Sequence, residues 1–194
     1  MFKPIKLIEA RGPVFICAVI VTAFFLASCK LHYAVEEFDL SISQEGSGSL
    51  SVHYTEISSN ETLTHLRGND LQFLKDMAQD PAHINKALEQ GVTLKARRLD
   101  FDDNSISGHV EAQAGDYTNL FKIFTNYELE VADRIYIIPL NGTVSRATLS
   151  EGGEIVVRNK KYAFAWPRDA QKISFKASYK VTGAKFTYND DGAQ

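Results

Sequence analysis

Apolar residues recur at every second position through most of the chain after residue 35. The clearest run lies near the C-terminus, where Ile173, Phe175, Ala177, Tyr179 and Val181 alternate with lysines and serines. Successive side chains of a strand point to opposite faces, so this spacing predicts strands with one buried and one solvated face. We expect strands at residues 38–42, 50–54, 92–101, 106–112, 127–138, 144–149, 155–157, 162–166 and 172–181.

Three segments carry helix signals instead. Leu71, Leu74 and Ala78 keep the helical period after a capping residue, Asn69 or Asp70. A second helix is expected to start at Asp80-Pro81 and to end at Gly91, and a third to run from Gly115-Asp116 to Phe124.

The order of these elements predicts the fold class. Antiparallel hairpins with two or three short helices packed on one face make an α+β fold, mostly antiparallel β-sheet. A change of phase near Arg97-Arg98 suggests a bulge in one strand. We expect a single domain over residues 34–188 and a polar tail at 189–194.

The longest apolar run lies outside this pattern, at the N-terminus. Lys3, Lys6 and Arg11 precede an uncharged run from Gly12 to Ser28. A basic segment, an apolar segment and small residues at the end are typical of a secretory signal, which predicts a leader over residues 1–28. A spanning helix needs about 20 apolar residues, and this run is slightly shorter.

The end of the run, Leu26-Ala27-Ser28-Cys29, resembles the lipobox of bacterial lipoproteins. The resemblance implies cleavage between Ser28 and Cys29, a diacylglycerol on Cys29, and a short tether at residues 29–33. It also implies a place in the cell envelope. Because Lys30 is not the aspartate of inner-membrane retention, we expect the periplasmic face of the outer membrane if the host has one, and otherwise the outer face of the plasma membrane. The alternative is an uncleaved signal anchor in which Cys29 has no role.

Composition excludes several classes of protein. The formal charge of −3 argues against general nucleic-acid binding, which needs a basic surface. Of the two cysteines, Cys17 belongs to the leader and Cys29 carries the expected lipid, so neither a disulfide nor thiol catalysis is expected.

The sequence contains only incomplete motifs for a catalytic or metal site. Asp100, Asp102, Asn104 and Glu111 have part of the spacing of a calcium loop, but Ser105 replaces its glycine, so a hairpin turn explains them without an ion. The histidines lack the i, i+4 spacing of a helical zinc site. We therefore expect no metal, no cofactor and no enzyme, with an envelope hydrolase as the minor alternative.

One aromatic strand is a candidate binding surface. Tyr162, Phe164 and Trp166 share a strand face, and basic residues flank them at Lys160, Lys161 and Arg168. Such a surface could rest on lipid headgroups or bind an acyl chain or a sugar. The alternative is an ordinary core strand with a polar edge.

The order of elements over residues 34–125 is similar to that of the LppM-like lipoprotein domain. The similar features are the Gly46-Ser47-Gly48 turn, the helical middle, Gly91–Leu94, Ser107–Val110 and the helix at Asp116–Phe124. The resemblance implies a β-rich domain that binds lipids or glycolipids, without catalytic residues.

These observations together predict a membrane-anchored, non-enzymatic lipoprotein of the bacterial envelope. It would bind a lipid, a glycolipid or another ligand close to the membrane. The alternative is a structural or protein-interaction subunit of an envelope assembly complex. The sequence leaves the oligomeric state open.

Overall fold

The structure is a computed structural model that describes residues 31–60, 64–102, 105–124, 126–140, 143–158, 160–181 and 184–185. The expected leader, its cleavage site at Ser28, the lipidation site Cys29 and the polar tail lie outside the described residues.

A six-stranded antiparallel sheet forms the main layer. Its strands, in spatial order, are β5 (Val92–Asp102), β6 (Ser105–Ala114), β3 (Gly48–Thr55), β2 (Val35–Ile42), β12 (Lys172–Tyr179) and β9 (Val144–Leu149). The alternating pattern predicted these strands because alternate side chains of each strand pack against the core, fully buried in the central strands and partly buried in β5 and β9.

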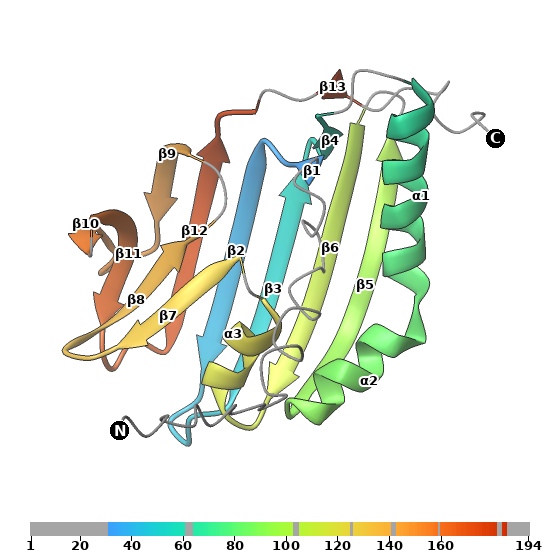
Figure 1. Cartoon of the computed structure of the whole chain (residues 1–194). Coiled ribbons are helices and arrows are strands. Elements are labelled where there is room, and N and C mark those ends of the chain that lie inside the picture. The colour runs from blue at the N-terminus through green and yellow to red at the C-terminus, as the bar shows by residue number, and fades with distance from the viewer. Residues whose placement is uncertain are drawn as a thin grey trace, which may run out of the picture.

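A second antiparallel sheet packs on part of the main sheet (Figure 1). Its spatial order is β10 (Glu154–Arg158), β11 (Lys161–Pro167), β8 (Arg134–Pro139) and β7 (Tyr127–Val131). Three short strands form a small third sheet: β1 (Leu31–His32), β4 (Ser58–Ser59) and β13 (Ala184–Lys185).

Helices cover a smaller part of the main sheet. α1 (Thr64–Gln79) and α2 (Pro81–Glu89) run along β5, at the right of Figure 1. A short 3₁₀ helix (Tyr117–Asn119) leads into α3 (Leu120–Ile123), which contacts β6 and β7. The described chain is thus mostly antiparallel β with three short α-helices, which is broadly α+β as expected. A second sheet, in addition to the helices, covers part of the main sheet.

Two helices begin where the sequence predicts, each at a capping aspartate. Asp80 accepts a hydrogen bond from the Ala82 amide, and Asp116 accepts one from the Thr118 amide. The first helix is different, because it begins at Thr64 rather than after Asn69 or Asp70. Asp70 lies inside the helix and is buried, and its carboxylate accepts a hydrogen bond from the Ser59 hydroxyl at 2.5 Å.

Two strand predictions were also wrong in detail. The segment expected as one strand at 127–138 is a hairpin of β7 and β8, closed by a hydrogen bond from the Ala132 amide to the Arg134 carbonyl. The turn contains no glycine or proline, so composition did not mark it. The bulge of β5 lies between Leu94 and Ala96 rather than near Arg97-Arg98.

Aromatic side chains fill the space between the two sheets. Phe175 on β12 stacks on Phe38 of β2 with ring centroids 4.7 Å apart, and it contacts Phe164 of β11 at 4.8 Å. Trp166 of β11 is fully buried, and its indole N–H donates to the Ser150 hydroxyl at 3.0 Å. These contacts join β2, β11 and β12 into one core.

Gly48 allows the 3₁₀ helix to lie against β3. A Cβ at this position would come within 2.5 Å of the Tyr117 Cβ and 3.0 Å of its Cα. We expect Gly48→Ala to lower the free energy of unfolding by roughly 1–3 kcal/mol, because the backbone must shift to relieve the overlap. Urea titration measures the effect. Gly115→Ala is the matched control, since nothing lies within 4 Å of its Cβ position; an equal loss in both variants would contradict the steric explanation.

Candidate functional site

The aromatic strand predicted from the sequence is β11, and its three aromatic side chains have different surroundings. Phe164 and Trp166 are fully buried in the core, whereas the Tyr162 side chain is 62% exposed. They therefore do not form one exposed aromatic surface. Arg168 follows the far end of β11, whereas Lys160 and Lys161 lie at its start beside Tyr162.

A pocket opens beside Tyr162, at the end of the sandwich where β8 leads into β9. Its volume is about 300 Å³. It is lined by Pro139, Leu140, Thr143, Val144, Lys160, Lys161 and Tyr162. We call this the Tyr162 pocket. It brings together three of the six residues singled out from the strand and adds Leu140 and Val144, which the sequence analysis missed.

Exposed apolar side chains continue the surface beyond the pocket. Val157 on β10 is the direct cross-strand partner of Tyr162 and is 71% exposed, and Ile155 on the same face is 51% exposed. Leu140 is also exposed at the pocket itself. Contiguous exposed apolar residues next to a concave site are typical of a binding surface.

The charge at the pocket is positive. Lys161 forms an ion pair with Glu128 at 3.6 Å, whereas in the described part of the chain no acidic group pairs with Lys160. Lys160 has a φ of +65°, a left-handed conformation that is uncommon for residues other than glycine. An uncompensated ammonium beside an apolar pocket favours an anionic ligand group.

A buried carboxyl group lies at the same end of the sheets as the pocket. Glu36 on β2 is fully buried. The Tyr179 hydroxyl donates to its Oε2 at 2.6 Å, and the Tyr127 hydroxyl donates to its Oε1. Both tyrosines pair with pocket residues across their sheets: Tyr179 with Val144, and Tyr127 with Pro139. The pocket wall and the tyrosines that contact Glu36 therefore lie on directly paired strands, β9 with β12 and β8 with β7.

Two further tyrosines complete the surroundings of Glu36. The ring of Tyr33 lies 4.7 Å from that of Tyr54 and 5.0 Å from that of Tyr179, measured between centroids. Burial raises the pKa of Glu36 to about 7, although hydrogen bonds from the tyrosines, led by Tyr127, lower it in part. Burial, together with the nearby Glu36 carboxylate, raises the pKa of the tyrosine hydroxyls above their ordinary range.

Sequence analysis missed this cluster, although one signal for it was present. Glu36 is in phase with Phe38 and Leu40, the inward-facing residues of the same strand. Extending the alternation by one step would have placed an acid in the core. Its tyrosine partners are distant in sequence, so no local pattern connects them to Glu36.

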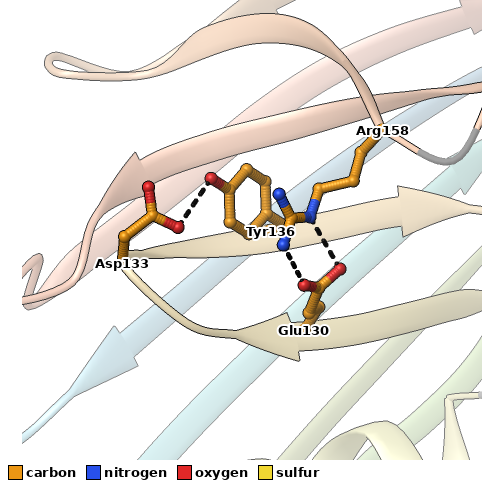
Figure 2. Close-up of polar contacts among 4 residues, drawn as sticks. All are labelled: Glu130, Asp133, Tyr136 and Arg158. Carbon is orange, nitrogen blue, oxygen red and sulfur yellow. Dashed lines mark hydrogen bonds and ion pairs between the residues drawn. The ribbon is translucent and has the colours of Figure 1, made fainter.

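On the outer face of the second sheet, charged and polar side chains pair with one another, as Figure 2 shows for Glu130, Asp133, Tyr136 and Arg158. The Arg158 guanidinium lies 4.3 Å from the centre of the Tyr136 ring, and its Nε donates to Glu130 at 2.8 Å. The Tyr136 hydroxyl donates to Asp133 at 3.0 Å. Because these groups satisfy one another, this face is a less suitable ligand site than the Tyr162 pocket.

A larger hollow lies at the opposite end of the main sheet. Its volume is about 570 Å³, and it is lined mainly by small and polar residues, including Ser41, Ser49, Thr93 and Gln113. No aromatic or charged side chain lines it. It therefore lacks the aromatic and cationic groups that the Tyr162 pocket combines.

The candidate cation loop can be assessed only in part, because Asn104 lies outside the described residues. Asp100 pairs with Arg98 at 3.2 Å, and Glu111 contacts His109 at 2.8 Å. Across the described ranges, no three His, Cys, Asp or Glu side chains are grouped to hold a metal ion. Within the same ranges, no helix is long and apolar enough to cross a membrane.

Comparisons with protein-family models, with curated proteins and with solved structures find no match. The resemblance to bacterial lipoproteins and to the LppM-like domain therefore rests on the sequence features alone. Function must be inferred from the geometry of the site.

The raised pKa of Glu36 predicts a pH-dependent stability. A carboxyl group whose pKa rises from 4.5 in the unfolded chain to about 7 in the fold stabilises the protein fully below pH 4.5. This contribution, roughly 3 kcal/mol, is lost as the pH rises to about 7. Urea titrations from below pH 4.5 to above pH 7 should show this loss in the wild-type chain and a flatter profile in Glu36→Gln.

The matched control is Glu37→Gln, because Glu37 lies next to Glu36 on the exposed face of β2. We expect this variant to keep the wild-type profile. If Glu36→Gln also kept it, Glu36 would not be the titrating group.

Proposed function

We propose that this chain is a non-enzymatic lipoprotein of the bacterial envelope, anchored by a lipid on Cys29, that binds an anionic lipid or glycolipid in the Tyr162 pocket. The observation that carries the proposal is the combination in one concave site of apolar walls with the ammonium group of Lys160. An amphiphile with a phosphate or carboxylate group matches both parts.

The position of the pocket in the chain supports a ligand at the membrane. Val144, in the pocket, pairs with Tyr179, and the Tyr179 amide donates to the Ala34 carbonyl at 2.9 Å. Ala34 is five residue steps along the chain from Cys29, and an extended chain spans at most about 3.6 Å per step, or roughly 18 Å. A lipid on Cys29 would therefore keep this end of the sandwich near the bilayer surface.

The size of the pocket limits what it takes. A volume of about 300 Å³ is at the lower end of the range for small-molecule sites. It suits a headgroup and the first part of a chain rather than a whole two-chain lipid. The exposed apolar residues Val157 and Ile155 would cover more of the chain along β10.

The alternative function is that of a protein-interaction subunit in an envelope assembly complex. One observation favours it: β10 is the last strand of its sheet and exposes apolar side chains. An edge strand of this kind can pair with a strand of another chain. The two functions use different parts of the same end of the molecule and can be tested separately.

Cys29→Ser tests the proposed anchor. We expect it to abolish incorporation of labelled fatty acid and to release the protein from the membrane fraction, because serine forms no thioether with diacylglycerol. Cys17→Ser is the matched control, since this cysteine lies within the expected leader. Unchanged membrane fractionation of Cys29→Ser would contradict the lipoprotein proposal.

Lys160→Gln tests the pocket. In the Cys29→Ser background, co-sedimentation with phosphatidylglycerol vesicles should be about fivefold weaker, because one basic residue near an anionic surface contributes about 1 kcal/mol. Tyr162→Ala should also weaken binding, by removing apolar contact. Phosphatidylcholine vesicles should bind the parent chain weakly.

Lys172→Gln is the control for general surface charge. It removes the same charge from the exposed face of β12, at the end away from the pocket. Equal weakening in both lysine variants would show that binding depends on net charge rather than on the pocket. Mass spectrometry of the purified lipoprotein provides an independent check, because a pocket ligand should co-purify with the wild-type chain and be depleted in Tyr162→Ala.

A further inference from the structure

The edge strand β10 is poorly protected for a free edge. Within the described residues it pairs only with β11, and it lies at the left end of Figure 1. Two of its five side chains, Ile155 and Val157, are apolar and more than half exposed. Soluble proteins usually guard such an edge with inward-pointing charges, proline or a bulge, so this edge is suited to pairing with another strand.

The residues of β10 are complementary to a second copy of the same strand. The strand reads Glu154-Ile155-Val156-Val157-Arg158. In an antiparallel pair centred on Val156, Glu154 lies opposite Arg158 of the other copy, and Ile155 lies opposite Val157. Opposite charges and β-branched residues directly across from one another stabilise a strand pair. Since both ends of the pair have the same composition, the contact closes with two-fold symmetry.

The charged groups retain the capacity for this extra contact. Arg158 uses its Nε and Nη2 for Glu130, and the guanidinium has further N–H donors on Nη1. Glu154 accepts from Arg134 through Oε2 at 2.6 Å, and its Oε1 can accept from another donor. A second copy would therefore extend the row Arg134–Glu154 to Arg158 and Glu130 of that copy without breaking either existing pair.

We propose that two copies of this chain associate through antiparallel pairing of their β10 strands, with Val156 on the two-fold axis. The two four-stranded sheets then form one continuous sheet. A five-residue strand pair is small beside the interfaces of permanent dimers, so the association is concentration-dependent. Confinement to a membrane by the proposed anchor would raise the effective concentration.

Cysteine cross-linking tests the register. Directly opposite residues of an antiparallel pair have Cα atoms about 4.5–5.5 Å apart, within the range of a disulfide. In native membranes with a mild oxidant, Val156→Cys should give a disulfide-linked dimer. Ile155→Cys alone should not, but Ile155→Cys and Val157→Cys expressed together should. The wild-type chain controls for Cys17 and Cys29, and Thr148→Cys on β9, an edge strand of the main sheet, controls for random collision.

Charge exchange tests the same interface in solution. We expect the purified protein in detergent to approach twice the monomer mass as its concentration rises, measured by light scattering after size exclusion. Glu154→Arg alone and Arg158→Glu alone should stay monomeric, because like charges then face each other. A mixture of the two variants should recover the dimer. Glu130→Gln removes the partner of Arg158 within the same chain and should still dimerise, which separates interface loss from local damage.

Three outcomes would overturn the proposal. The first is a monomer at every concentration, with no cross-link at Val156. The second is a dimer that cross-links at Thr148 rather than at Val156 or that persists in both charge variants. The third is a Val156→Cys cross-link to a different envelope protein and not to a second copy, which would assign the edge to that protein.

Discussion

The buried carboxyl group of Glu36 is the interaction on which this end of the sandwich depends. An unpartnered acid in a protein core is costly, and two tyrosines offset the cost by donating hydrogen bonds. Glu36 and Tyr179 belong to the main sheet, whereas Tyr127 belongs to the second sheet. The Tyr127 hydrogen bond crosses between the sheets and forms only when they hold one relative position, so it fixes β7 against β2. The Tyr162 pocket is built on residues that pair with the same two tyrosines, and its shape depends on this contact.

The main sheet has six strands and the second sheet has four. The surfaces used by the proposed functions lie at the end where the second sheet stops. Helices α1 and α2 flank the β5 edge of the main sheet, whereas the second sheet ends in β10, whose inward-facing side chains are exposed. The aromatic contacts of Phe175 fill the middle of the sandwich, and one of them joins Phe175 to Tyr127 of the Glu36 cluster. The result is a pocket and a free strand edge beside each other. A ligand near the membrane and a second copy of the chain would use adjacent surfaces.

Local signals in the sequence predicted local structure well. Asp80 and Asp116 cap helices because a cap involves amides only two residues away. Alternation identified most strands for the same reason, since the face of each side chain depends on its immediate neighbours. The hairpin within residues 127–138 was missed because Ala132 and Asp133 turn the chain without glycine or proline. Asp70 was misjudged as a cap because its partner, Ser59, lies in another element.

By itself, the sequence determined which residues share a strand face and where two of the helices begin, and it predicts a leader that ends at Ser28, directly before Cys29. It placed Tyr162, Phe164 and Trp166 on one face but could not tell that a second layer covers only the last two. Tertiary structure alone decided that β12 lies beside β2 and that Tyr127 and Tyr179, 91 and 143 residues from Glu36, meet its carboxyl group. The physical reason is range: alternation and capping act between neighbours, whereas burial depends on which distant strands pack together.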